Sequence, residues 1–177
     1  MDKMTPFIEL FDGPNSRSVP LFVVERIVAD PSRIQELMDC FFDDRKMICQ
    51  RAAWPLGMIA DDHPHLLMPY LEQLLATIEG KASDTVVRNV LRAFQFMDFP
   101  EDQEGRVFDI CFEFLLDVNK AIAIRVFGMT VSANIAMKYP ILAEELIPVI
   151  EEHIPHGSAG FRSRGSKLLH KLRGLST

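Results

Sequence analysis

The sequence predicts an all-α fold, a right-handed superhelix of about four antiparallel helical hairpins followed by a C-terminal capping helix. Arginines recur at positions 51, 88, 125 and 162, so that the interval is 37 residues each time. A fixed period of this length is typical of stacked helical hairpins. Apolar residues also return every three or four positions, and proline or acidic turn signals separate these stretches. The period predicts an architecture rather than a chemistry.

The composition is that of a globular chain. Of the 177 residues, 48% are hydrophobic and 25% are charged, which excludes a disordered protein. The three cysteines show no close pairing, and no apolar run reaches the roughly 18 residues that span a bilayer. The first residues also lack the basic and apolar segments of a signal peptide. We therefore expect a cytoplasmic protein with no membrane partner, in which residues 17–177 form a single repeat domain behind an N-terminal arm of residues 1–16.

The N-terminal elements are the least regular. Residues 1–16 combine a short apolar patch with the turn Asp12–Ser16, which predicts a short helix or a loosely docked arm. Residues 18–28 carry apolar side chains at helical spacing, although their β-branched content leaves a strand open. Asp30 is expected to cap the next helix, with Pro31 at its first position.

The central stretch predicts a complete hairpin. Asp43 and Asp44 are expected to open a helix that ends near His63. Pro64 is expected to start its partner helix, and Gly80 to stop it.

The C-terminal half continues this pattern. Ser83 is expected to cap a helix, and Pro100 to open its partner, with acidic residues that complement the helix dipole. Further helices are expected after Asn119, after Pro140 and after Ser158. Prolines at positions 55, 69 and 148 should bend their helices or mark their true first turns.

Three segments carry a family resemblance. Cys49–Ala60 contains an arginine, two alanines and a leucine-glycine pair, His63–Leu75 is led by a proline, and Ser83–Arg88 is a polar turn followed by valine-arginine. This pattern resembles HEAT repeats, which are armadillo-like helical solenoids, over roughly residues 31–172. The resemblance implies that the repeat structure rests on Arg51, Trp54, Pro64 and Pro140.

The resemblance implies binding rather than catalysis. Such solenoids offer an extended concave face to a partner, and their repeat contains no catalytic residue. We therefore expect a small scaffold that binds another protein through the face of its second helices. An acid-rich set of side chains there suits a basic partner segment. The candidate residues are Glu72, Gln73, Arg106, Asp109, Glu113, Glu144 and Glu145.

The alternative function is a nucleic-acid or phosphate-binding module. The periodic arginines could form an anion track, or each could bond to the turn and carbonyls of its neighbour. The first 155 residues hold 14 bases and 25 acids, whereas the chain from His156 onward holds five bases and no acid. The acidic majority counts against a polyanionic partner, and the basic tail is a local exception. The candidate residues are Arg88, Arg92, Arg125, Arg162 and Arg164.

We find no catalytic signature. The sequence contains no Gly-rich phosphate loop, no Gly-x-Ser-x-Gly turn and no carboxylate pair in an apolar setting. The histidine pairs 63/65 and 153/156 lack the spacing and companion ligands of a metal site. We therefore expect no cofactor and no metal, and an enzyme of unknown type ranks third, behind the two binding functions. Trp54, the only tryptophan, is more typical of a core than of a base-stacking platform.

Overall fold

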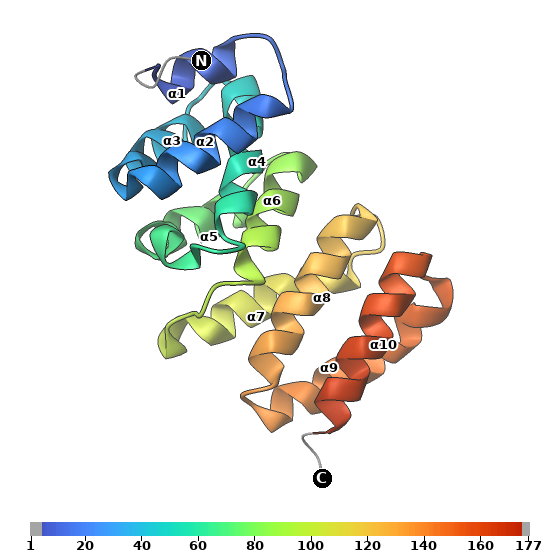
Figure 1. Ribbon diagram of the computed structural model, residues 1–177. Coiled ribbons are helices and arrows are strands. Elements are labelled where there is room, and N and C mark those ends of the chain that lie inside the picture. Colours follow the sequence, from blue (N-terminus) through green and yellow to red (C-terminus); the bar gives the residue numbers. More distant parts are fainter. Residues whose placement is uncertain (1–4, 175–177) are drawn as a thin grey trace. The chain divides into compact units, whose positions relative to one another are not determined.

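The computed structural model describes residues 5–174, and every regular element in this range is a helix (Figure 1). The all-α prediction is therefore confirmed. The chain divides into two compact units, Met1–Met97 and Asp98–Thr177. The boundary falls within the third expected hairpin, between its first helix and its second. The single domain expected for residues 17–177 stays a prediction.

The helices follow the expected order. In the first unit they are α1 (Phe7–Asp12), α2 (Ser18–Ala29), the 3-10 helix η1 (Pro31–Arg33), α3 (Ile34–Phe41), α4 (Lys46–Ile59), the 3-10 helix η2 (Pro64–Tyr70), α5 (Leu71–Glu79) and α6 (Asp84–Phe94). In the second unit they are α7 (Glu101–Leu116), α8 (Ile122–Ala136), α9 (Pro140–His153), the 3-10 helix η3 (Ile154–His156) and α10 (Ala159–Arg173).

In the first unit, the first helices of successive hairpins pack against one another. α4 packs against α2 and α6, and its Ile48 and Leu56 side chains are fully buried. Gly57 lies where α4 and α6 approach closely, because a Cβ atom there would lie 3.1 Å from the backbone oxygen of Asn89. The absence of a side chain at position 57 thus allows close packing of the two helices.

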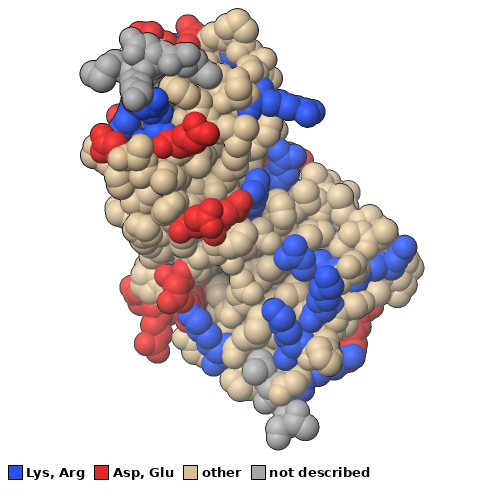
Figure 2. Space-filling view, viewed as in Figure 1, with Lys and Arg blue, Asp and Glu red and all other residues tan. Residues whose placement is uncertain are grey.

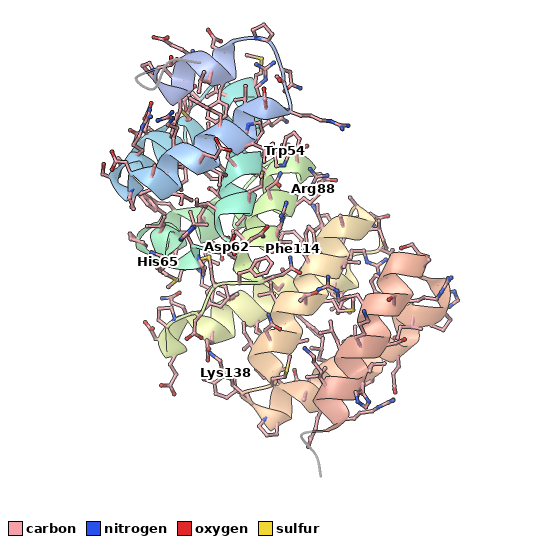
Figure 3. The ribbon with its side chains drawn as sticks, in the orientation of Figure 1. Trp54, Asp62, His65, Arg88, Phe114 and Lys138 are labelled. Atoms are coloured by element: carbon pink, nitrogen blue, oxygen red, sulfur yellow. The ribbon has the colours of Figure 1, made fainter. Side chains whose placement is uncertain are left out.

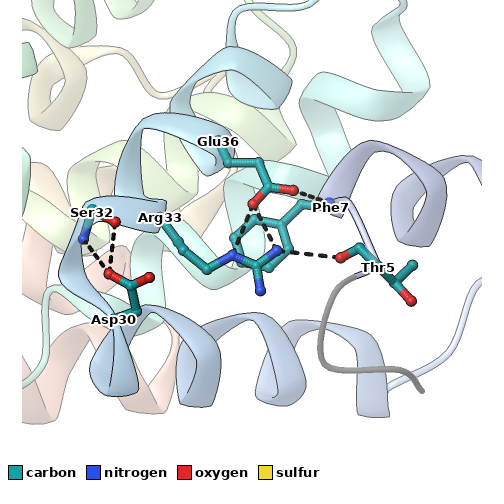
Figure 4. A network of polar contacts seen from close by, with 6 residues as sticks. All are labelled: Thr5, Phe7, Asp30, Ser32, Arg33 and Glu36. Carbon is teal, nitrogen blue, oxygen red and sulfur yellow. Dashed lines mark hydrogen bonds and ion pairs between the residues drawn. The ribbon is translucent and has the colours of Figure 1, made fainter.

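The stretch expected as a short helix or a loose arm is a helix docked on the first unit. Phe7 and Phe11 of α1 are fully buried. Figure 4 shows how its start is held: the Arg33 guanidinium pairs with Glu36 and donates to the Thr5 carbonyl, while Glu36 accepts from the Phe7 backbone N–H. The guanidinium also lies 4.3 Å from the Phe7 ring centroid. Charge and burial together fix α1 in place.

One predicted helix start is wrong, and one predicted cap has the right position but no capping bond. α4 begins at Lys46 rather than at Asp43, because the Asp43 carboxylate accepts from the backbone and side chain of Arg45 and forms a turn before the helix. The Arg45 hydrogen bonds lower the pKa of Asp43 to about 2. Ser83 stands at the N-cap position of α6 but makes no capping bond. Its hydroxyl instead lies 3.0 Å from Nε2 of Gln50, which donates to it.

The predicted cap at Asp30 is confirmed, since its carboxylate accepts from the Ser32 backbone N–H. The Ser158 cap is also confirmed, with its hydroxyl 3.2 Å from the Phe161 nitrogen. The helix expected after Pro64 is a 3-10 helix up to Tyr70 and becomes an α-helix only at Leu71. A proline at position 69, inside η2, has no N–H to donate to an α-helical bond.

In the second unit, α7 packs tightly against α8, and α10 packs on both α8 and α9. A Cβ atom at Gly128 of α8 would lie 2.7 Å from the Cys111 backbone oxygen of α7, so the glycine is what lets the helices meet. The buried Glu104 accepts from Lys138 and from the Tyr139 hydroxyl, which joins the start of α7 to the turn between α8 and α9.

Candidate binding pocket

Three of the four periodic arginines lie on the first helices of their hairpins, and the fourth lies on the terminal helix α10. Arg51 is on α4, Arg88 on α6, Arg125 on α8 and Arg162 on α10. α4 packs against α6 in the first unit, and α8 packs against α10 in the second. The 37-residue interval therefore marks equivalent helices of the repeat.

Three of these arginines donate to backbone carbonyls. Nη1 of Arg51 lies 2.5 Å from the Phe11 oxygen and 2.6 Å from the Gly13 oxygen, at the C-terminal end of α1. The remaining two make corresponding bonds within the second unit. Nε of Arg125 lies 3.0 Å from the Leu115 oxygen at the end of α7, and Nη1 of Arg162 lies 2.8 Å from the Gly157 oxygen. Helix ends leave carbonyls unsatisfied, so these geometries suit structural roles.

Arg88 differs from the other three. Its side chain is exposed, and it has no hydrogen bond or ion pair with any residue in the described range 5–174. Among the other arginines expected to bind anions, Arg92 pairs with Asp61 at 2.6 Å, and Nη1 of Arg164 lies 3.4 Å from the Thr130 hydroxyl oxygen. Arg88 is thus the candidate whose guanidinium is left to meet a ligand.

A pocket of about 280 Å³ opens beside Arg88 in the first unit. Its walls come from the end of α1 and the following loop, the start of α2, and one side of α4 and of α6. Figure 3 shows Trp54 and Arg88 on the neighbouring helices α4 and α6. The pocket is lined by Leu10, Phe11, Pro14, Asn15, Ser16, Val19, Pro20, Met47, Gln50, Arg51, Trp54, Thr85, Arg88 and Asn89.

The pocket combines exposed apolar surface with positive charge. Trp54 is 41% exposed and Met47 is 44% exposed. These lining residues include two arginines and no aspartate or glutamate. Gln50 is held by its bond to Ser83, and Nδ2 of the buried Asn89 donates to the Thr85 carbonyl. An apolar group that carries a negative charge would therefore meet a complementary and largely fixed surface.

The expectation that Trp54 belongs to the core is wrong. Met47, Arg51 and Trp54 are spaced by four and then three residues, which places them on one stripe of α4. That stripe lines the pocket, while Ile48, Leu56 and their neighbours form the buried side. The same spacing is visible in the sequence and could have indicated this stripe. Its exposure could not be read there, because it depends on the path of the α1–α2 loop, which leaves the stripe uncovered by the described residues.

The acidic candidates lie elsewhere. Asp109 and Glu113 are exposed on α7, and Glu144 and Glu145 are exposed on α9, all in the second unit. None of these four carboxylates has a hydrogen bond or ion pair with a residue between 5 and 174. In the first unit, Glu72 and Gln73 are exposed on α5, and Arg106 of α7 in the second unit is partly exposed.

The thiols do not point to chemistry at neutral pH. Burial raises the pKa of Cys40 to about 12, with a further contribution from the nearby Glu36 carboxylate. Burial also raises the pKa values of Cys49 and Cys111. These thiols are therefore held in their unreactive protonated form. Between residues 5 and 174, no group of three or more His, Cys, Asp and Glu side chains is arranged to hold a metal ion.

In the part of the chain that the structure describes, no helix is both long and apolar enough to cross a bilayer. Neither the curated proteins nor the solved structures compared with the chain gave a match. The family model of the HEAT repeat domain matches residues 16–172, which is most of the chain. Together with the helical hairpins and their 37-residue period, this match shows that the chain belongs to the HEAT-repeat family.

Proposed function

We propose that this HEAT-repeat protein is a scaffold that binds another protein, and that exposed acids on its second helices bind a basic segment of that partner. HEAT repeats generally mediate protein interactions. The observation that carries the proposal is the set of four carboxylates on α7 and α9 that have no partner among the described residues: Asp109, Glu113, Glu144 and Glu145. Within one helix, Asp109 and Glu113 are four residues apart and share a face.

The exposed acids are suited to steering and register rather than to large individual binding energies. An exposed ion pair contributes about 0.2–1 kcal/mol, so the partner needs several basic residues in sequence. At low ionic strength such a surface also raises the association rate, and both effects weaken as salt increases.

Binding of a basic peptide to paired variants tests the proposal. The probe is a blocked dodecapeptide rich in Lys and Arg, and the test variant is Asp109→Asn/Glu113→Gln. The matched control is Glu25→Gln/Asp44→Asn, which removes two exposed acids from the first unit. We expect the α7 variant to weaken binding severalfold, measured by fluorescence anisotropy, and the control to leave it unchanged.

Affinity purification from the source cells supplies a second readout. The wild-type chain should recover a partner protein that contains a basic segment, and the Asp109→Asn/Glu113→Gln chain should recover less of it. Equal binding of the peptide by both double variants contradicts the proposed surface. Recovery of no partner, together with turnover of a small metabolite, rejects the scaffold function itself.

The alternative, an anion-binding module, is favoured by one observation on α10. Lys167 and Lys171 are exposed and lie four residues apart. Their side chains form no hydrogen bond or ion pair with any residue in the described range. Figure 2 shows Lys and Arg side chains over the α10 part of the second unit. A salt titration of duplex DNA binding separates the two functions, since contacts to phosphates make the affinity fall steeply with salt. Lys167→Gln/Lys171→Gln should then reduce the slope.

A further inference from the structure

We propose that the pocket between the α1–α2 loop, α4 and α6 receives one apolar side chain and an adjacent carboxylate from a segment of a partner protein. The inference deepens the proposed function and rests on it in one respect, because the occupant is a protein. The site is separate from the acid-bearing helices α7 and α9, and its charge has the opposite sign.

The pocket contains an arginine, Arg88, whose side chain has no partner among residues 5–174. Arg51 also lines the pocket, but its Nη1 atom already donates to the carbonyls of Phe11 and Gly13. Arg88 is exposed and makes no hydrogen bond or ion pair with residues 5–174. A guanidinium can bind both oxygens of one carboxylate through two parallel N–H donors. Arg88 is therefore the group that would hold the charged part of the occupant.

The charged side chains that line the pocket are all positive. No aspartate or glutamate is among the described residues that line the pocket, although the first unit as a whole contains more acids than bases. A carboxylate that enters would meet arginine and neutral polar groups, without a like charge on the wall. The surrounding acids would instead oppose the approach of a long polyanion. This contrast favours a single carboxylate over a nucleic acid.

The pocket also exposes apolar surface. Trp54 is 41% exposed and Met47 is 44% exposed, and both face the pocket together with Val19. Tryptophan and arginine are among the residue types most enriched at the binding hot spots of protein interfaces. The flexible thioether of Met47 can adapt to the shape of an apolar side chain. These residues would bind the uncharged part of the occupant.

The volume of the pocket limits what can occupy it. The volume of about 280 Å³ lies just below the roughly 300–1,000 Å³ of ordinary small-molecule pockets. Such a volume suits one large side chain with its neighbouring carboxylate better than a folded element. The occupant is therefore an anchor, in which an acidic residue stands next to a residue such as leucine or phenylalanine.

Trp54 makes the pocket directly measurable. It is the only tryptophan in the chain, so the intrinsic tryptophan fluorescence reports on this site alone. The probes are two blocked decapeptides, one with a central Glu-Leu pair and one with Gln-Leu at the same place. We expect the Glu-Leu peptide to shift the emission of Trp54 in a saturable way, and the Gln-Leu peptide to bind about two- to fivefold more weakly, as for the loss of an exposed ion pair.

Two variants and one control complete the test. Arg88→Gln should weaken the Glu-Leu peptide to the level of the Gln-Leu peptide, with no further loss when both changes are combined. Met47→Gln should weaken both peptides, because it removes apolar contact. Lys81→Gln removes an exposed charge that does not line the pocket, and it should leave binding unchanged. Circular dichroism and thermal melting verify that each variant is folded.

The outcomes separate this inference from the proposed function. If the Lys/Arg peptide binds through α7 while the Glu-Leu peptide leaves Trp54 unchanged at millimolar concentration, only the pocket inference is overturned. Binding of the Glu-Leu peptide that is insensitive to Arg88→Gln also overturns it. A single-stranded DNA dodecamer that shifts Trp54 at lower concentration than the peptide assigns the pocket to nucleic acid instead. Dependence on Arg88 with an inactive α7 surface supports the pocket and contradicts the basic-segment proposal.

Discussion

The Nζ atom of Lys138 lies 2.5 Å from Oε1 of Glu104, a carboxylate whose side chain is only 4% exposed. The same ammonium lies 2.8 Å from the exposed Asp98 carboxylate, and Tyr139 donates its hydroxyl to Oε2 of Glu104 at 2.6 Å. Burial acts to raise the pKa of Glu104, but the hydrogen bonds from Lys138 and Tyr139 outweigh it and hold the pKa below its usual value. The hydrogen bonds that Lys138 donates to Asp98 and Glu104 raise the pKa of Lys138. This network joins the start of α7 to the turn between α8 and α9.

Lys138→Met should destabilise the protein. The change removes the cation from a buried carboxylate while the Tyr139 hydroxyl still donates to it, so we expect the free energy of unfolding to fall by about 1–2 kcal/mol. Urea denaturation measures the difference. Lys167→Met, on an exposed part of α10, serves as the control and should change stability by less than about 0.5 kcal/mol. Equal effects of the two substitutions would contradict a role for the buried pair.

Stability should fall as the pH is lowered through the range in which His153 titrates. Burial, with the nearby Arg125 charge, holds the pKa of His153 below its usual value of about 6.5. The unfolded chain therefore binds the proton at a higher pH than the folded one does, and stability is lost as the pH drops from about 6.5 toward the folded pKa. In denaturation curves recorded from pH 7.5 to pH 5, His153→Gln should show a flatter dependence than the wild type. Identical slopes would refute the assignment.

Two glycine-to-alanine substitutions should change the stability of the protein in opposite directions. At Gly128 the new Cβ atom would lie 2.7 Å from the Cys111 carbonyl oxygen, so α7 and α8 must shift, which costs about 1–3 kcal/mol. At Gly105, in the exposed part of α7, nothing lies within 4 Å of the added atom. Removing the flexibility of glycine there should stabilise the helix by about 0.5–1 kcal/mol. Thermal melting of both variants gives the comparison, and the reverse order would disprove the close α7–α8 approach.

Arg51 and Arg88 share a place in the 37-residue period but should differ in their effect on folding. Arg51→Met removes the donor to the Phe11 and Gly13 carbonyls, and we expect a loss of about 1–3 kcal/mol of unfolding free energy. Arg88→Met removes an exposed side chain with no bond among the described residues, and it should cost less than about 0.5 kcal/mol. Hydrogen exchange at the α1 amides should quicken only in the first variant.

The helices could be read from the sequence because their signals are local. Periodic apolar residues, the Asp30 and Ser158 caps, and the prolines at helix starts depend on neighbours within a few positions. The helix start at Asp43 and the capping bond at Ser83 are absent, because a nearby or distant side chain competes at each position. Arg45 draws Asp43 into a turn, and Gln50, 33 residues away, holds the Ser83 hydroxyl. Such competition depends on which groups the fold brings together.

The pocket was harder to predict, because it depends on a surface that is left uncovered. Trp54 lies on an apolar helix, and the sequence alone favours a buried side chain there. Its exposure follows from the path of the loop between α1 and α2, which forms a wall beside α4 without closing over it. The arginine period likewise gave no indication that Arg88 is left without a carbonyl partner while Arg51, Arg125 and Arg162 each have one.

The docking of α1 bears on how the chain can be shortened. The family match starts at residue 16, and a fragment cut there would lack Phe7 and Phe11, which are fully buried in the first unit. Arg51 and Arg33 would lose their carbonyl acceptors, and Leu10 would no longer line the pocket. We therefore expect a fragment that starts at residue 16 to be less stable than one that keeps the chain from Thr5 onward.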